Sequence, residues 1–321
     1  MESLFDAAKE IRKLVRGRVA ENEPMALHTT LGVGGPADVF AEVETQEDLA
    51  ALVKYVSQAR LLWMVLGDGT NLLVSDRGVR GVVIALTGDF KKIDARPPFI
   101  EAGAAARMSA VADAAAENNL AGLEGVGVVP GTLGGAIVMN AGTHRGYIAD
   151  IVENVSVLTP DGSQRVLSRE ECGFTYRGSR FQSDRSLIVI GAKLRLRPGD
   201  RSEIRRSLEE IRRHRAQTQP QGRSAGCFFK NPRSVLPGGD CEGEVLSAGQ
   251  LIESAGGKGL RLGRAVVSEI HANFIINEGG ATASDVRALA ERVRELVRER
   301  HGVELEYEVR IVGEWREGGE N

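Results

Sequence analysis

The stretch Val129-Pro130-Gly131-Thr132-Leu133-Gly134-Gly135-Ala136-Ile137-Val138-Met139-Asn140-Ala141-Gly142 interrupts an apolar run with four glycines and two small polar residues. Glycine lets the main chain approach a ligand closely and adopt positive φ, and a turn with unused N–H groups attracts anions. A second run of the same character, Leu66-Gly67-Asp68-Gly69-Thr70-Asn71, lies earlier in the chain. We therefore expect one anionic ligand between two glycine loops.

Neither run is a standard nucleotide-binding motif. The lysine of a Walker A loop is missing from both, and neither completes G-x-G-x-x-G ahead of a helical pattern. The alternative for each loop is a tight turn between packed elements, in which glycine serves only the backbone geometry.

The composition is that of an ordinary globular chain, with 42% hydrophobic and 26% charged residues over 321 residues. A formal charge of -3 gives no reason to expect a nucleic-acid partner. The arginines between 205 and 215 alternate with apolar residues, which is typical of the exposed face of a helix. No apolar run is long enough to span a membrane, so no membrane partner is expected.

Cysteine and histidine usage argues against a disulfide framework or a metal site. Cys172, Cys227 and Cys241 lack C-x-x-C spacing, and the five histidines are scattered. We expect reduced thiols, a cytoplasmic location and no metal.

Hydrophobic periodicity and capping residues predict an α+β chain whose pattern changes near Gln219-Pro220-Gln221-Gly222. Predicted helices cover 1–16, 45–59, 109–118, a short helix opened by a capping box at 168–171, then 202–215, 249–255 and 282–301. Predicted strands cover 62–66, 82–86, 152–158, 165–167, 187–196, 227–229, 273–277 and 305–312. The strand at 62–66 is expected to be buried.

Several segments, in their order along the chain, resemble the motifs of a known family. They are Gly34-Gly35-Pro36-Ala37, residues 66–75, residues 129–142, Phe174-Thr175-Tyr176-Arg177-Gly178-Ser179, residues 224–232, His271-Ala272-Asn273-Phe274 and residues 305–310. From about Thr29 to Gly313 the chain resembles the UDP-N-acetylenolpyruvoylglucosamine reductases, flavoenzymes of peptidoglycan precursor synthesis. The short span between Arg177 and Cys227 resembles the shorter form of that family, which lacks a tyrosine-loop insertion.

The resemblance implies a two-subdomain FAD-binding fold of the vanillyl-alcohol-oxidase/PCMH type, followed by a C-terminal α+β substrate-binding domain. We expect residues 1–80 and 81–200 to form the two FAD subdomains and 215–304 the substrate domain, with 305–321 a strand returning to the FAD domain. The implied reaction uses FAD as cofactor and NADPH as co-substrate, and it reduces the enolpyruvyl ether of UDP-N-acetylglucosamine to UDP-N-acetylmuramate. We expect a monomer.

The resemblance assigns the FAD pyrophosphate to the two glycine loops. The implied cofactor residues are Gly67, Asp68, Gly69, Thr70, Asn71, Pro130, Gly131, Thr132, Gly134, Gly135, Asn140 and Gly142. Asp68 departs from the small residue common in the family, and a carboxylate at that position would repel phosphate.

Arg177, Cys227 and Glu308 are the implied catalytic residues. Arg177 would grip the enolpyruvyl carboxylate with its charged fork, and Glu308 would stabilise an enolate-like intermediate, with Glu306 as a rival on the same strand face. Cys227 would donate the proton from a position where the family more often has serine. A thiol is the better acid of the two, so the role is kept. The alternatives are a solvated arginine, a cysteine that fills the core and an exposed strand glutamate.

The implied substrate-binding residues are Tyr176, Lys230, Asn231, His271 and Asn273. Two other functions remain open from the residues alone. One is another FAD oxidase of the same superfamily, and the other is a non-catalytic UDP-sugar-binding flavoprotein or sensor.

Overall fold

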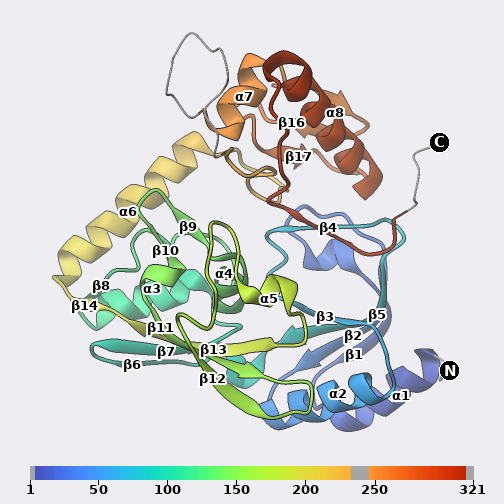
Figure 1. Cartoon of the computed structure of the whole chain (residues 1–321), viewed down its shortest axis with the longest axis vertical. Helices are drawn as coiled ribbons and strands as arrows, with labels where there is room; N and C mark the ends of the chain where they lie inside the picture. Colours follow the sequence, from blue (N-terminus) through green and yellow to red (C-terminus); the bar gives the residue numbers. More distant parts are fainter. Residues whose placement is uncertain (1–3, 233–245, 316–321) are drawn as a thin grey trace. The chain divides into compact units, whose positions relative to one another are not determined.

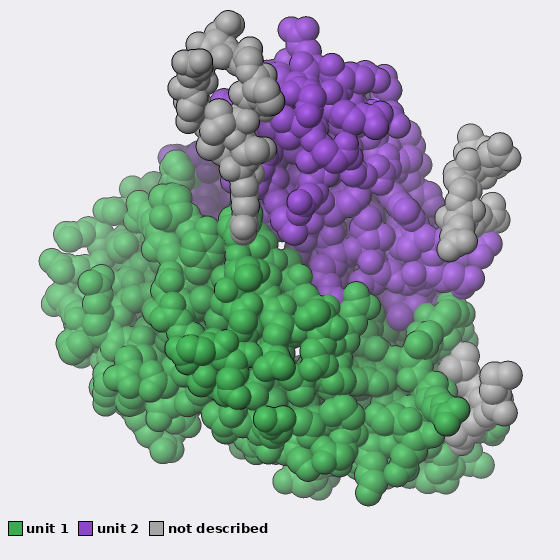
Figure 2. Space-filling view, in the orientation of Figure 1, with its two compact units in different colours: residues 1–23, 37–68, 80–214 green, residues 24–36, 69–79, 215–321 purple. Residues whose placement is uncertain are grey.

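The computed structural model describes residues 4–232 and 246–315. The chain divides into two compact units, coloured in Figure 2. Unit 1 comprises residues 1–23, 37–68 and 80–214, and unit 2 comprises residues 24–36, 69–79 and 215–321. Each unit is built from stretches that are distant in sequence. The division into two FAD subdomains and a substrate domain stays a prediction.

Unit 1 contains two larger sheets. The first has the strand order β1-β2-β5-β3, and the second has the order β12-β11-β13-β7-β6. Their strands are β1 (Val19–Pro24), β2 (Pro36–Val43), β3 (Trp63–Leu66), β5 (Val79–Leu86), β6 (Ile93–Arg96), β7 (Phe99–Gly103), β11 (Val152–Leu158), β12 (Gln164–Ser168) and β13 (Ile188–Arg195). Two short pairs add β8 (Leu120–Ala121) with β14 (Arg197–Pro198), and β9 (Gly142–Thr143) with β10 (Gly146–Tyr147).

Unit 1 also contains six helices and two 3-10 turns among its described residues (Figure 1). They are α1 (Leu4–Leu14), α2 (Gln46–Gln58), α3 (Met108–Glu117), α4 (Leu133–Met139), α5 (Arg180–Ser183) and most of α6 (Arg201–Thr218), with the 3-10 turns η2 (Gly88–Lys91) and η3 (Ile148–Asp150). Helices α3 and α4 pack on the second sheet, against β7 and β13. One continuous apolar core therefore holds the loop that precedes α4.

Unit 2 has its own core around Phe228 and Phe229. Its elements are η1 (Met25–His28), β4 (Leu72–Val74), α7 (Ala248–Ser254), β15 (Arg261–Leu262), β16 (Ala265–Val267), β17 (Ile275–Asn277), α8 (Ala283–His301) and β18 (Arg310–Val312). Helix α8 packs on the antiparallel sheet β15-β16-β17, and β18 runs parallel to β4. The last strand, β18, is thereby paired with β4, which lies near the beginning of the sequence.

Helix boundaries agree with the capping rules. Thr45 accepts a hydrogen bond from the Asp48 N–H at the start of α2, and Thr282 does the same for Asp285 at the start of α8. Gly302 ends α8 in the left-handed conformation, at φ +66. Most arginines of α6 are exposed and lie opposite its buried Ile204, Leu208 and Ile211, as predicted. Arg215 departs from this prediction, because it is half-buried on the same face as Ile211, and burial lowers the pKa of its guanidinium.

Three local predictions are wrong. Ser168 and Glu171 exchange capping-box hydrogen bonds, yet only a turn forms, since Gly173 enters the left-handed region at φ +56 directly after it. The strand predicted over 305–312 is regular only from Arg310 to Val312. The strand predicted at 62–66 is not fully buried, because Leu62 is 70% exposed.

The strand predicted at 273–277 begins at Ile275, and the strand predicted at 227–229 pairs only through isolated bridges.

Within the described ranges, none of the helices has the length and apolar character needed to cross a membrane.

Candidate active site

The two glycine loops meet inside unit 1. A Cβ added to Gly67 would lie 2.8 Å from the Thr132 Oγ1 atom, so only glycine allows this approach. Gly131 has φ +124, a conformation that also favours glycine. The predicted cofactor residues at these positions of unit 1 are therefore neighbours in space.

The loop at 130–135 offers fewer N–H groups than its glycines suggest. The N–H groups of Leu133 and Gly134 donate to Ala106 and Ala104 at 2.8 Å each, and that of Gly135 donates to Thr132 Oγ1 at 3.3 Å. In the part of the chain that the structure describes, the N–H groups of Gly67, Gly131 and Thr132 have no acceptor. These three N–H groups are therefore the ones at the two loops without an acceptor of their own, and the FAD contacts of Gly134 and Gly135 stay predictions.

Asp68 is paired within unit 1. Its Oδ2 atom lies 3.4 Å from Nε of Arg107, the residue that precedes α3. This cation offsets the charge that made Asp68 an unexpected residue in a phosphate loop. The sequence reasoning missed Arg107, because no spacing rule links the two residues.

The remaining residues of the first loop belong to unit 2. Gly69 has φ +63, and a Cβ there would collide with the His28 carbonyl oxygen. Asn71 donates from Nδ2 to the Glu308 carbonyl at 3.0 Å, and its own carbonyl accepts from the Arg310 N–H at 3.0 Å. Asn71 thus holds the backbone of a predicted catalytic residue. The FAD contacts of Thr70, Asn71 and Pro130 stay predictions.

Arg177 lies in unit 1 at the apex of a tight turn. Thr175 and Gly178 exchange backbone hydrogen bonds of 2.9 and 3.2 Å, and Arg177 between them has φ +54. Its Nη1 donates to the Gly142 carbonyl at 2.8 Å, and its guanidinium carbon lies 5.6 Å from the centroid of the Tyr176 ring. A non-glycine residue in this conformation is strained, as is common at functional sites.

Two amides hold this turn. Asn140 caps the end of α4 and is 6% exposed; it donates to the Thr175 carbonyl at 2.7 Å and accepts from the Ala149 N–H at 3.2 Å. Gln182 donates to the Arg177 carbonyl at 3.0 Å. Sequence reasoning assigned Asn140 to the cofactor and missed Gln182, since neither bond follows from local pattern. The FAD contact of Asn140 stays a prediction.

A cavity of about 490 Å³ adjoins the turn, within unit 1. Its walls include Tyr147, Asp150, Phe174 and Tyr176. The Tyr147 and Tyr176 rings meet edge to face, with centroids 6.4 Å apart. Aromatic rings and polar groups in one hollow suit an organic ligand with polar substituents.

The segments that carry Cys227 and Glu308 pair with each other in unit 2. Phe229 pairs antiparallel with Tyr307, and the N–H groups of Glu308 and Val309 both donate to the Phe228 carbonyl, at 2.9 and 3.3 Å. This bulge aligns the segment after Cys227 with the segment that carries Glu308. Glu308 therefore lies opposite Phe228, the residue that follows Cys227.

The same segments carry the predicted substrate residues. Lys230 forms a 3.1 Å ion pair with Glu306, and Asn231 accepts a hydrogen bond from the Ala248 N–H at 3.0 Å. Glu306, the rival to Glu308, is thus paired with a lysine. Tyr307 lies between Glu306 and Glu308 in the sequence. Its ring stacks on that of Phe229 with centroids 5.3 Å apart, and its hydroxyl donates to Glu291 at 2.8 Å. Sequence reasoning missed this anchor.

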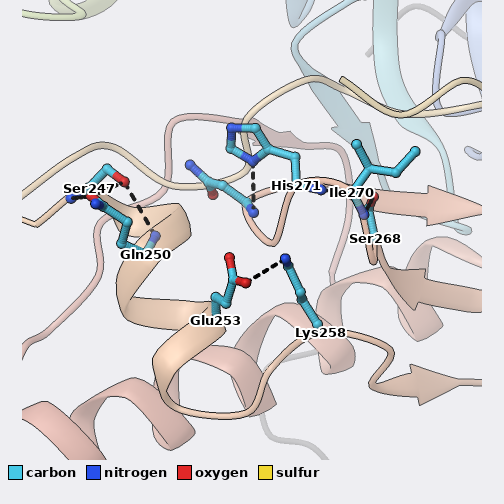
Figure 3. Close-up of polar contacts among 8 residues, drawn as sticks. Ser247, Gln250, Glu253, Lys258, Ser268, Ile270 and His271 are labelled. Atoms are coloured by element: carbon cyan, nitrogen blue, oxygen red, sulfur yellow. Dashed lines mark hydrogen bonds and ion pairs between the residues drawn. The ribbon is translucent and has the colours of Figure 1, made fainter. Parts of the chain in front are cut away.

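His271 lies against helix α7, where a Cβ on Gly249 would lie 3.2 Å from its Cε1 atom. Its Nδ1 accepts the Asn273 N–H at 3.2 Å, and Figure 3 shows the other ring nitrogen directed away from that bond. Burial lowers the pKa of the His271 imidazole, and the Lys258 ammonium lowers it further. The lowered pKa favours the neutral imidazole, and the bond that Nδ1 accepts leaves Nε2 to carry the proton.

The two cysteines that the structure describes are both free thiols. Burial raises the pKa of Cys172 to about 11, which makes it unreactive, whereas Cys227 is only half-buried. Cys241 lies outside the described residues. Within those residues, no group of His, Cys, Asp and Glu side chains is arranged to hold a metal ion.

Comparison with known proteins identifies the family. The C-terminal domain model of UDP-N-acetylenolpyruvoylglucosamine reductase matches residues 218–312, and an FAD binding domain model matches residues 37–168. The reductase of Heliobacterium modesticaldum is 44% identical over 308 residues, which covers 95% of this chain and 94% of that protein. The chain belongs to the UDP-N-acetylenolpyruvoylglucosamine reductase family.

Two further members support this. The reductase of Caldanaerobacter subterraneus is 43% identical over 98% of this chain and 99% of its own length. The crystal structure of the reductase from Thermus caldophilus superposes with a TM-score of 0.76 at 40% identity, covering 92% of this chain and 98% of that one. The predicted α+β fold, with an FAD-binding region and a C-terminal reductase domain, is confirmed.

Proposed function

We propose that this chain is an FAD-dependent reductase that uses NADPH to convert the enolpyruvyl ether of UDP-N-acetylglucosamine to UDP-N-acetylmuramate. Family membership supports the reaction, and one structural observation carries its assignment to residues. The bulged pairing at the Phe228 carbonyl holds Glu308 beside the Cys227 segment. An acid and a charge-stabilising carboxylate on two paired segments suit the delivery of a proton to a carbanionic carbon.

The residues of unit 1 fit the anionic part of FAD. Gly67, Gly131 and Thr132 lie where the two loops approach each other, and their backbone N–H groups and the Thr132 hydroxyl are the proposed donors. Backbone N–H groups in a concave turn are suited to phosphate oxygens. When bound, the flavin accepts hydride from NADPH and passes it to the methylene carbon of the substrate.

Arg177 is proposed to hold the substrate carboxylate. The Arg177 Nη1 donates to the Gly142 carbonyl, and a guanidinium is a permanently charged planar fork that can grip both oxygens of a carboxylate. The strained turn and its amide anchors fix the fork before substrate arrives. Orientation of the enolpyruvyl group is the expected result.

Cys227 is proposed as the general acid. Once the methylene carbon has gained hydride, the adjacent carbon carries the negative charge, and the Cys227 S–H gives that carbon its proton. The thiolate left behind takes a proton from water. Glu308 is proposed to stabilise the negative charge, with Tyr176, Lys230, Asn231 and His271 as substrate contacts. A monomeric state and a cytoplasmic location complete the proposal.

The absorption spectrum tests this function directly. Purified protein is expected to be yellow, to bleach with NADPH without oxygen, and to regain colour when the enolpyruvyl UDP-sugar is added. Protein that binds no flavin would contradict the proposal. Flavin that NADPH reduces but the UDP-sugar never reoxidises would favour the alternative of a non-catalytic sugar-binding flavoprotein.

A further inference from the structure

Asn273 is almost fully buried, and both ends of its side chain are used by one neighbouring residue. Its exposed fraction is 3%. Oδ1 accepts the Phe229 N–H at 2.9 Å, and Nδ2 donates to the Phe229 carbonyl at 2.8 Å. The side chain therefore pairs with Phe229 as a strand backbone would.

The backbone around Asn273 extends this pairing toward Cys227. The Asn273 carbonyl accepts the Phe228 N–H at 2.8 Å, and Phe274 forms an antiparallel bridge with Cys227. On the other side of Cys227, Gly226 has φ +76, and no atom lies within 4 Å of an added Cβ. The Cys227 backbone is thus held by its bridge to Phe274 and by the following residues, Phe228 and Phe229, which Asn273 binds.

We infer that Asn273 is a positioning residue that sets the place of the Cys227 thiol through the Phe229 backbone, and is not a substrate contact. This inference rests on the proposed function, in which Cys227 delivers the proton. A buried amide that already pairs with the chain presents no exposed face to a sugar or diphosphate. Displacement of a catalytic group by about 1 Å costs on the order of 100-fold in rate.

Replacement of Asn273 by aspartate tests the inference with little change of shape. The variant keeps an acceptor for the Phe229 N–H but sets an oxygen against the Phe229 carbonyl. Anaerobic stopped-flow mixing separates flavin reduction by NADPH from reoxidation by the enolpyruvyl UDP-sugar. We expect Asn273→Asp to slow reoxidation by about 100-fold while reduction stays at the wild-type rate.

Asn277 provides a matched control. It is 4% exposed in the same unit, and its amide donates to the Leu31 carbonyl at 3.0 Å and accepts the Gly279 N–H at 2.9 Å. We expect Asn277→Asp to lower the melting temperature as Asn273→Asp does, with both half-reactions unchanged. Equal slowing of reoxidation in both variants would overturn the inference. If Asn273→Asp does not fold, Asn273→Ser takes its place.

A double-mutant cycle with Cys227→Ala gives the decisive readout. If Asn273 acts through the thiol, Asn273→Asp adds no further slowing once the thiol is gone. Multiplicative slowing would show a general structural role and overturn the inference. Wild-type reoxidation in Cys227→Ala alone would remove Cys227 from the mechanism, and the inference with it. If reoxidation is slow in Cys227→Ala but remains at the wild-type rate in Asn273→Asp, the inference is overturned and the proposed function is not.

Discussion

The turn that carries Arg177 and the paired segments that carry Cys227 and Glu308 are held in different ways. Arg177 sits in a turn closed by residues 175 and 178, and its carbonyl is bound by Gln182, five positions away. The Cys227 and Glu308 segments are held by contacts across 44 and 237 positions, through Asn273 and Asn71. The Arg177 turn is thus closed by local backbone bonds, with anchors to Asn140 and Gly142 across 35 positions. The segments of Cys227 and Glu308 have no such local closure and depend on long-range pairing.

Loss of the acid is expected to have the largest effect. Cys227→Ala should slow flavin reoxidation by about 1,000-fold, within the usual range for removal of a general acid, and leave reduction by NADPH unchanged. Cys227→Ser should retain turnover, since the hydroxyl keeps a proton at the same place. Stopped-flow absorbance of the flavin measures both. Reoxidation of the alanine variant at the wild-type rate would contradict the assignment.

Loss of the cation should have the next largest effect. Arg177→Met should lower kcat/KM for the UDP-sugar by about 100-fold, with FAD content unchanged, because one charged fork is lost from the substrate carboxylate. Arg177→Lys serves as the charge-matched control and should recover only part of the loss, since an ammonium lacks the bidentate geometry. Full recovery by lysine would argue that charge alone matters at the turn. Steady-state kinetics checks both variants.

A substitution of Asn140 tests whether the turn at residues 175–178 needs the Asn140 amide or is held by its own backbone hydrogen bonds alone. Asn140→Ser should lower the free energy of unfolding by about 2 kcal/mol, because the Ala149 N–H and the Thr175 carbonyl lose a buried partner. KM for the UDP-sugar should rise as Arg177 loses its place, while the protein stays saturated with FAD. Loss of FAD with an unchanged KM would instead favour the cofactor contact predicted from sequence. Denaturant unfolding and flavin titration separate the two.

The smallest expected effect concerns pH and His271. Its pKa in the folded chain is lowered by burial, so the unfolded chain takes up a proton more readily. The neutral imidazole contributes its full stability above the unfolded value of about 6.5, and that stability is lost as pH falls through the lower, folded pKa. His271→Gln should flatten this part of the curve of melting temperature against pH. Parallel curves for the two proteins would exclude the effect.

Local rules predicted the elements whose causes are local. The caps at Thr45 and Thr282 and the stop at Gly302 follow from neighbouring residues, and the structure has them. The strand predicted over 305–312 failed because its first half pairs with residues 228–230 through a bulge. No periodicity within 305–312 encodes the position of the Phe228 carbonyl.

The candidate site divides in the same way. Motif order pointed to Arg177, Cys227 and Glu308 as residues to test, and their roles stay predictions. It did not indicate that the side chains of Asn71, Asn140 and Asn273 donate to backbone carbonyls at or near these three residues. An asparagine in a motif looks like a ligand contact, since amides are common in binding sites. Its actual partner is set by the fold, because the bonded residues lie 35 or more positions away.

The composition of unit 2 from stretches 24–36, 69–79 and 215–321 has a consequence for synthesis of the chain. Strand β4 leaves the ribosome long before β18, its parallel partner, exists. Unit 1 already has its whole sequence once residue 214 has emerged, while the early pieces of unit 2 wait for the last part of the chain. A fragment that begins at residue 215 lacks both β4 and Asn71, so expression of the C-terminal region alone would not yield the intact unit.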